Sequence, residues 1–178
     1  MKSKVISISA IASALVAISL TVGCYVEVVE IVSLVVSSVF VILPLYYKSF
    51  KGSVLCFLAG GLVALLCSLP TLAFSIVLPA YAGFFGLYPI IKHVFLEKRV
   101  SNVLQVMLGL TWCVLACFGV YFLYTAVIGL TFEDLPKFIT DYILIFVGIF
   151  GVVFYFVFDR FIVVSKRFLD FYLKKIIK

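Results

Sequence analysis

The sequence predicts an all-helical, polytopic membrane protein, a compact bundle of six transmembrane helices. Of the 178 residues, 66% are hydrophobic and only 12% are charged, which is about half the charged share of an ordinary soluble domain. A soluble domain of this size has too little interior to hide so many apolar side chains. The uncharged runs are long enough for helices that cross a bilayer, whereas a barrel strand needs only about ten residues. These observations, together with the distribution of basic residues, define the fold class.

The charged residues divide the chain into uncharged runs, and each run predicts one or two spans. Val5–Val26 and Ile31–Tyr47 are long enough for one span each. Gly52–Ile91 carries no charge, and as one helix it would be about 60 Å long, about twice the hydrocarbon thickness of a bilayer. It must therefore turn once, and Ser68-Leu69-Pro70-Thr71 near its middle is the predicted turn. The six predicted spans are 5–26, 29–47, 53–69, 71–91, 103–130 and 140–159.

The basic residues predict the orientation of these spans. With six spans, thirteen of the fourteen Lys and Arg residues fall on the side that holds both termini, and only Lys137 falls on the other. Basic loops are retained on the cytoplasmic side of a membrane, so both termini are predicted to be cytoplasmic in the cell membrane. The net charge of +6 then reflects topology and does not point to nucleic acid.

The segment after the last predicted span, 160–178, is predicted to be a basic cytoplasmic tail. Its apolar residues recur at helical spacing and its lysines line another face. This pattern is typical of a helix that lies on the cytoplasmic leaflet, where anionic lipids attract basic side chains. Docking to a cytoplasmic partner is the alternative. The apolar stripe consists of Phe161, Val164, Phe168, Tyr172 and Ile176.

Catalytic chemistry is not predicted. The single histidine, His93, cannot form a zinc cluster or a His-Glu-x-x-His motif, and the chain has no Walker-type phosphate loop. Cys113 and Cys117 share a helix face at i and i+4 and are interpreted as small packing residues. Every Asp, Glu, Lys and Arg lies at the end of a predicted span, whereas ion-driven carriers usually keep an ionisable group near the midplane. We therefore expect no enzyme, metal, cofactor or self-powered carrier.

Acids and aromatic residues near the predicted outer surface leave two interpretations open. The outer acids, Glu27 and Glu30 among them, either complement the basic inner side or form the mouth of a solute site. The tyrosines are interfacial anchors or solute contacts, and the deeper Trp112 either fills the core or stacks on a ligand. On an ideal helix Trp112 and Tyr121 point about 180° apart, so the outer pair of Tyr121 and Tyr124 is the favoured contact. A solute held there would be planar, with donors or positive charge.

Small residues on the first predicted helix form a candidate docking face. Ala10 and Ala14 are four residues apart, with Ser13 and Ala17 beside them. Small residues at this spacing let another helix approach closely, which is a main source of helix association in lipid. The partner is either a helix of the same chain or another protein.

The layout now resembles a known family. The Ala10-x-x-x-Ala14 helix, the loop Tyr47–Gly52 and the following Leu58-Ala59-Gly60-Gly61 together resemble the substrate-binding S-components of energy-coupling-factor vitamin transporters. The stretch Phe84–Lys92 resembles uncharacterised bacterial membrane proteins allied to them.

This resemblance implies a membrane-embedded subunit that binds a vitamin or micronutrient from outside and is powered by separate ATPase subunits. It implies docking through Ala10, Ala14 and Ala17 onto a transmembrane coupling subunit, which a pair of ATPases drives. The small-molecule pocket that it implies draws on Glu27, Glu30, Trp112, Tyr121, Tyr124 and Tyr142.

The competing function is a non-transporting membrane scaffold of bacterial envelope or cell-wall machinery. Such a scaffold contacts the lipid bilayer and protein partners but no solute. A transport subunit is expected to hold a cavity under the outer loops with several polar groups converging on it, and a scaffold is expected to be packed solid there.

Overall fold

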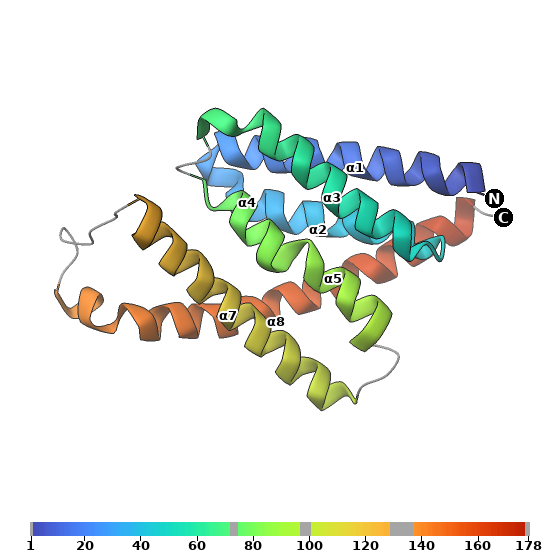
Figure 1. Cartoon of the computed structure of the whole chain (residues 1–178). Coiled ribbons are helices and arrows are strands. Elements are labelled where there is room, and N and C mark those ends of the chain that lie inside the picture. Colours follow the sequence, from blue (N-terminus) through green and yellow to red (C-terminus); the bar gives the residue numbers. More distant parts are fainter. Residues whose placement is uncertain (1, 72–74, 97–100, 129–136, 177–178) are drawn as a thin grey trace.

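The computed structural model describes residues 2–71, 75–96, 101–128 and 137–176, although a few side chains in these ranges, that of Tyr124 among them, are outside the description. The described residues form helices and no strand (Figure 1). Five of the helices are long and apolar enough to cross a membrane: Ser3–Tyr25, Glu27–Tyr46, Phe50–Cys67, Asn102–Leu123 and Tyr142–Leu169. The predicted all-helical class is therefore confirmed.

The first three helices pack side by side and match the first three predicted spans (Figure 1). They are α1 (Lys2–Tyr25), α2 (Glu30–Tyr46, preceded by the short 3-10 helix η1, Glu27–Val29) and α3 (Phe50–Cys67). Gly60 of α3 lies against α1, since a Cβ at this position would stand 2.6 Å from Val16 Cγ1 and 3.1 Å from the Ser13 carbonyl oxygen. The missing side chain lets the two helix backbones touch, which is how small residues join helices in lipid.

The chain turns after α3 where the sequence predicts, and the next helix is broken. The turn contains the 3-10 helix η2 (Leu69–Thr71). The broken helix then runs from Val77 to Leu96 as α4 (Val77–Ala80), the π-helix η3 (Tyr81–Phe85), α5 (Leu87–Ile91) and the π-helix η4 (Lys92–Leu96). It stands in place of the predicted span 71–91, starting and ending later.

A proline contributes to the irregularity of this broken helix. Pro89 has no N–H to donate to the carbonyl of Phe85 four residues earlier. The Ser38 hydroxyl of α2 lies 2.8 Å from that carbonyl and 2.8 Å from the Leu34 carbonyl of its own helix, so its single proton is shared between the two. Ser38 belongs to a stripe of buried serines on α2, and this contact ties α2 to the broken helix.

The last two helices differ from the prediction in one respect. α7 spans Asn102–Ile128, and α8 is one continuous helix of 40 residues, Lys137–Ile176, about 60 Å long at 1.5 Å per residue. The helix is continuous across the predicted boundary between span 140–159 and tail 160–178, so no break in the backbone marks that boundary. No Gly or Pro occurs between 152 and 176 to stop the helix, so the helical period of the tail simply continues that of the span.

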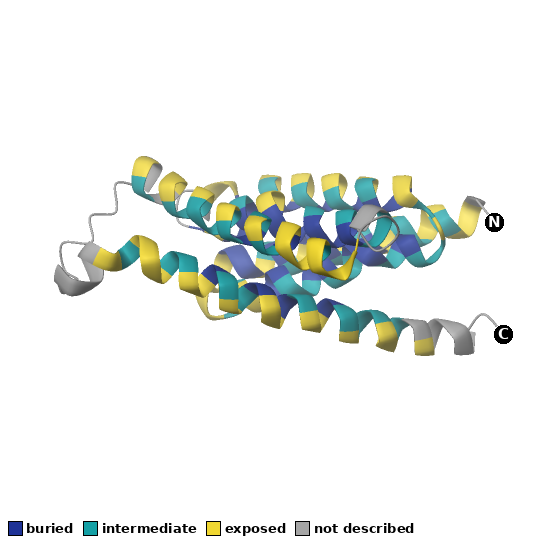
Figure 2. Cartoon of the chain, turned by 90° about the horizontal axis from the view of Figure 1, so that it is seen from below, coloured by how far each residue is buried: buried dark blue, intermediate teal, exposed yellow. Residues whose placement is uncertain are grey.

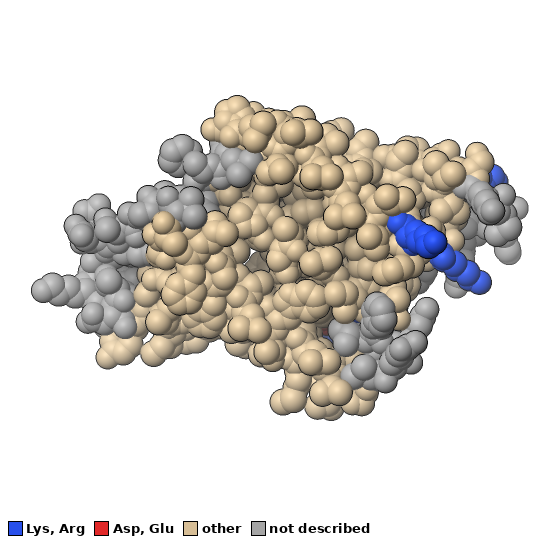
Figure 3. All heavy atoms as spheres, in the orientation of Figure 1, with Lys and Arg blue, Asp and Glu red and all other residues tan. Residues whose placement is uncertain are grey.

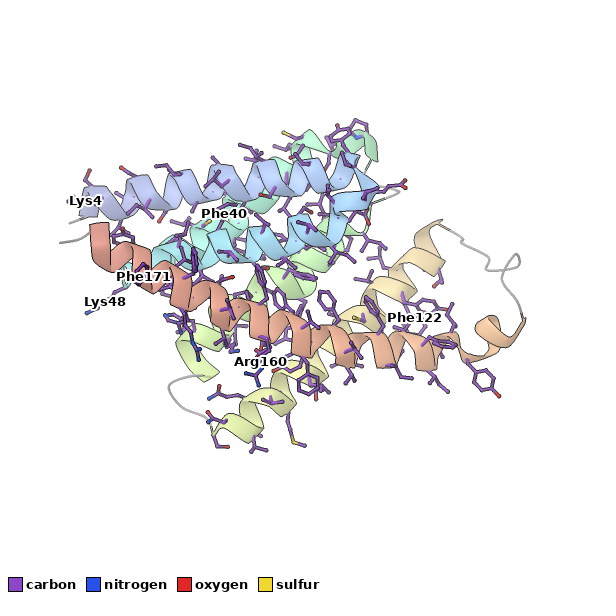
Figure 4. All side chains as sticks on the ribbon, turned by 180° about the vertical axis from the view of Figure 1, so that it is seen from behind. Lys4, Phe40, Lys48, Phe122, Arg160 and Phe171 are labelled. Carbon is purple, nitrogen blue, oxygen red and sulfur yellow. The ribbon has the colours of Figure 1, made fainter. Side chains whose placement is uncertain are left out.

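The C-terminal half of α8 runs along the bundle towards the N-terminus of α1, and both chain ends lie at the same end of the molecule (Figure 1). From behind, Phe171 lies towards the end that holds Lys4 and Lys48, whereas Phe122 lies towards the opposite end (Figure 4). The Tyr46 hydroxyl at the end of α2 donates to the Lys166 carbonyl of α8 at 2.9 Å. This hydrogen bond places residue 166 beside the end of α2.

The core lies where α1, α2, α3 and the broken helix meet, and it continues to α7 and α8 through Cys113, Tyr155, Phe158 and Ile162; the outward faces of the helices are exposed (Figure 2). Val16, Leu20, Val41 and Val77 are fully buried there. Most of the visible surface carries no charge, and the basic residues on this face gather at the end that holds both termini (Figure 3). Such an apolar exterior suits a hydrocarbon solvent.

Candidate functional site: an apolar groove beside a buried ion pair

The predicted solute residues of the outer loops do not line the groove that the structure contains. Glu27 is exposed on η1, Glu30 is half-buried at the start of α2, and Tyr142 is exposed on α8. Tyr121 is half-buried and packs against Phe122 with ring centroids 5.5 Å apart. The predicted contact through the Tyr124 side chain lies outside the described residues.

The predicted docking face of α1 is divided by the packing of the bundle. Ala10 and Ala14 are exposed, whereas Ala17 is buried with 6% of its surface accessible. The buried face of α1 consists of Ala12, Val16 and Leu20, and Ala17 lies close enough to it in angle to be covered too. Only Ala10 and Ala14 of the predicted trio remain open to a partner.

The groove lies between the broken helix and one face of α7, and its volume is about 780 Å³. Pro79, Gly83 and Ile91 form the wall on the broken helix, and residues from Leu108 to Leu123 form the other wall. Small-molecule sites in proteins usually have volumes of about 300–1,000 Å³. In size, therefore, the groove fits a vitamin-sized molecule.

Trp112 connects the two walls of the groove. Its indole Nε1 donates to the Gly83 carbonyl oxygen across the groove at 2.9 Å. Thr111, the hydroxyl-bearing residue of the lining, donates to the Met107 carbonyl of its own helix at 2.9 Å. The polar atoms of these two side chains are thus already bonded within the protein, so the groove presents mainly carbon to whatever enters it.

An ion pair lies on the other side of the broken helix, with Lys92 buried and the Asp159 side chain 20% exposed. The Lys92 ammonium pairs with Asp159 Oδ1 of α8, and the Tyr88 hydroxyl donates to the same oxygen at 2.7 Å. The hydroxyls of Tyr88 and Tyr155 are 3.2 Å apart. Lys92 is 8% exposed and both tyrosines only 1%. We refer to these four residues as the polar cluster.

The polar cluster places two charged residues, which the sequence assigned to the ends of spans, inside the helical bundle. Asp159 lies near the middle of α8, and Lys92 is enclosed between helices. Along α8, Asp159 comes seven residues before Lys166, which the end of α2 contacts, so it lies about 10 Å deeper in the bundle. Charges at such depth are kept in pairs because an isolated one is costly.

The sequence contains a signal for this cluster that assigning spans from the positions of charges overlooks. Tyr88 and Lys92 are four residues apart, and so are Tyr155 and Asp159. Residues at this spacing share a helix face, so two helices each present one tyrosine and one opposite charge. Two such motifs of opposite charge indicate a pairing between helices.

The groove and the polar cluster are neighbours. Gly109 of α7 lines the groove, and a Cβ at this position would stand 2.6 Å from the Tyr155 hydroxyl oxygen. Tyr155 therefore lies between Gly109 on one side and Tyr88 on the other. Further along the same contact, the Cys113 thiol donates to the Gly151 carbonyl at 3.5 Å.

Metal chemistry finds no support among the residues described. Within them, no group of three or more His, Cys, Asp or Glu side chains is placed to hold a metal ion. The free cysteines Cys24, Cys56 and Cys113 are buried among apolar neighbours, where they serve as small packing residues.

Within the described residues, fold and site together define a helical protein with five helices suited to crossing a membrane and a mainly apolar groove beside the pair of Lys92 with Asp159. Comparison with protein-family models, curated proteins and solved structures finds no match for the chain.

Proposed function

We propose that the protein is the membrane-embedded substrate-binding subunit of a vitamin or micronutrient uptake system powered by separate ATPase subunits. In this proposal it has six spans and both termini are cytoplasmic. The five long helices leave one span to be assigned, and the broken helix from Val77 to Leu96 supplies it as the fourth along the chain. Its twenty residues have a helical length of about 30 Å, the thickness of the hydrocarbon core. The resemblance to energy-coupling-factor S-components motivates the proposal.

The groove is the observation that carries the proposal. It has the volume of a small-molecule site, it is walled by a broken helix, and an indole lies across it. Discontinuous helices commonly build the sites of membrane transport proteins. We therefore place the solute at Trp112 and Gly83, deeper than the Glu27 and Tyr121 region that the sequence favoured, and expect its inserted part to be apolar or aromatic.

A scaffold of envelope machinery is the second candidate, and the lining of the groove favours it. No charged residue lines the groove, and binding sites for small molecules usually have a few polar groups that orient the ligand. An apolar helix of a partner protein would need no such groups. The two candidates differ in what contacts Trp112: a small solute in the transport proposal, and a helix of a partner protein in the scaffold.

The test uses Trp112 as its own reporter, because it is the only tryptophan of the chain. The protein in lipid nanodiscs is titrated with a panel of vitamins while Trp112 emission is recorded. Gly119→Leu should fill the groove without a clash, since a Cβ at Gly119 meets nothing within 4 Å. Ala126→Leu is the matched control, because Ala126 is exposed on the same helix outside the lining.

A solute subunit is expected to show saturable quenching by one member of the panel. Gly119→Leu should weaken its apparent affinity at least tenfold, and Ala126→Leu should leave it unchanged. If no vitamin changes Trp112 emission, while a co-purified membrane protein does so and is lost in Gly119→Leu, the scaffold candidate replaces the transport proposal.

A further inference from the structure

The broken helix forms one wall of the groove without a regular backbone hydrogen-bond ladder of its own. The Gly86 N–H donates to the Tyr81 carbonyl five residues back, at 2.8 Å, which is the π-helical pattern. A second π-helix, η4, begins at Lys92; Pro89 lies between the two π-helices, and Pro79 lies in α4 just before the first. π-turns and prolines are sites where helices bend. The position of this wall is therefore set largely by what holds it from outside.

Contacts with α8 hold this wall on the side away from the groove. Aromatic rings supply the apolar part, with the Phe85 and Phe158 centroids 5.0 Å apart and those of Phe84 and Phe158 5.4 Å apart. The polar part is the pair of Lys92 with Asp159 and the hydrogen bond from Tyr88 to the same carboxylate. Packed aromatic rings allow the broken helix to slide along α8. The ion pair and the hydrogen bond to the same carboxylate oxygen fix one register between these two helices.

The opposite wall of the groove is held by the same stretch of α8. Tyr155 comes one helical turn before Asp159, and its hydroxyl lies against Gly109 of α7. Val114 of α7 approaches Gly151, with its Cα 3.4 Å from where a Cβ of that glycine would stand. One face of α8 thus holds both walls, α7 through Tyr155 and the broken helix through Asp159.

We infer that Lys92 and Asp159 are positioning residues that set the width of the groove at Trp112. Their pairing holds α5 against α8, and this keeps the Gly83 carbonyl within reach of the Trp112 indole. Removing one charge leaves the other buried without its counter-ion, so α5 moves away from α8 and takes Gly83 with it. The inference concerns solute affinity only in so far as the proposed solute site is correct.

The experiment measures how far membrane lipid reaches Trp112, and it needs no solute. Wild type and variants are placed in bilayers of phosphatidylcholine with brominated acyl chains, which quench an indole they contact. In Lys92→Met the quenched fraction of Trp112 emission should rise at least twofold. Lys92→Arg, which keeps the charge, should stay at the wild-type value.

Ser38→Ala is the control for a purely structural loss. It removes another buried hydrogen bond to the broken helix, the one to the Phe85 carbonyl, but on the side of α2 rather than α8. Quenching in this variant should stay at the wild-type value. Folded Lys92→Met with wild-type quenching, or an equal rise in Ser38→Ala, overturns the inference.

Should Lys92→Met fail to fold, Asp159→Asn decides by the same readout, because its amide oxygen still accepts from Tyr88 while the negative charge is gone. A rise in quenching supports the inference and an unchanged value overturns it. Since no vitamin is added, the positioning role stands or falls separately from the proposed solute. A protein that binds no vitamin can still show the rise.

Discussion

The first three helices and the last two are held together in different ways. In α1–α3 the backbones touch: a Cβ at Gly60 would collide with Val16 on α1, and one at Gly23 would stand 2.0 Å from Ser33 Oγ on α2. In their most apolar stretches, 22%, 44% and 28% of residues are buried in the first three spanning helices, against 11% and 17% in the last two. α7 instead crosses α8 (Figure 1) and touches it through Gly109 and Gly151. For brevity we refer to α1–α3 as the rigid half, and to α7, α8 and the broken helix that contacts both as the rearranging half.

Both halves contain hydrogen bonds between helices, such as that from the Ser53 hydroxyl to the Val41 carbonyl in the first. The second half adds a charged contact, the pair of Lys92 on the broken helix with Asp159 on α8. Close packing cannot be loosened gradually, because small gaps already forfeit dispersion energy. An ion pair or a hydrogen bond, in contrast, can exchange partners without opening a cavity. The groove lies between α7 and the broken helix, outside the α1–α3 packing. If it takes a solute as proposed, its walls are therefore not fixed by that packing.

The largest effect is expected where the rigid half is overpacked. Gly60→Leu places a side chain against Val16 and the Ser13 carbonyl, and backbone atoms cannot rotate away. Overpacking typically costs about 1–3 kcal/mol and occasionally more. The thermal unfolding midpoint in detergent should therefore fall sharply. Gly119→Leu on α7, where a Cβ meets nothing within 4 Å, is the matched control and should unfold near the wild-type temperature.

Both substitutions gain the same helix propensity, so their difference isolates packing. Equal unfolding midpoints for Gly60→Leu and Gly119→Leu would remove the distinction between a rigid and a rearranging half.

The positions of charged residues predicted the helix ends well in the first half of the molecule and only in part in the second half. α1, α2 and α3 end near Glu27, Lys48 and Cys67, where a charge or the predicted turn closes each apolar run. The same logic fails at Asp159 because its counter-ion, Lys92, is 67 residues away along the chain. A charge that is paired with another helix does not have to end a span. The signal for this pairing is the opposed pair of motifs, Tyr88 with Lys92 and Tyr155 with Asp159, and not the position of either charge along the chain.

The candidate site, like the helix ends, could be predicted from the sequence only in part. Trp112 stood out as a deep aromatic residue, and it does line the groove. Its partner, the Gly83 carbonyl, is a backbone atom and carries no sequence signature. The opposed glycines Gly83 and Gly119 leave the groove open only because tertiary packing aligns them, which composition and periodicity do not encode.

An intermediate effect is expected at the boundary between the halves. Ser38→Ala leaves the Phe85 carbonyl without its donor, since Pro89 has no N–H to replace it. An unsatisfied buried carbonyl costs about 1–3 kcal/mol. Ser37→Ala is the matched control: Ser37 is also buried on α2, but its hydroxyl bonds only within its own helix, to Leu34. Unfolding midpoints should fall for Ser38→Ala and hardly change for Ser37→Ala, and equal shifts would contradict this account.

The smallest effect on stability, and the most specific effect on assembly, is expected on the outer face of α1. Ala10 and Ala14 are exposed, so Ala10→Leu with Ala14→Leu should change the free energy of unfolding by no more than about 0.5 kcal/mol. Bulky side chains there would nevertheless block the close approach of a coupling subunit. Co-purification with a co-expressed coupling subunit and its ATPases should fall at least tenfold, while any quenching of Trp112 by solute persists.

The control for this double substitution is Ala59→Leu, exposed on α3, which should retain the complex. Ala17→Leu is a poor test, because Ala17 is buried and its enlargement would disturb the bundle itself. A complex that survives the double substitution would assign α1 to lipid contact alone and leave the rigid half without a docking role.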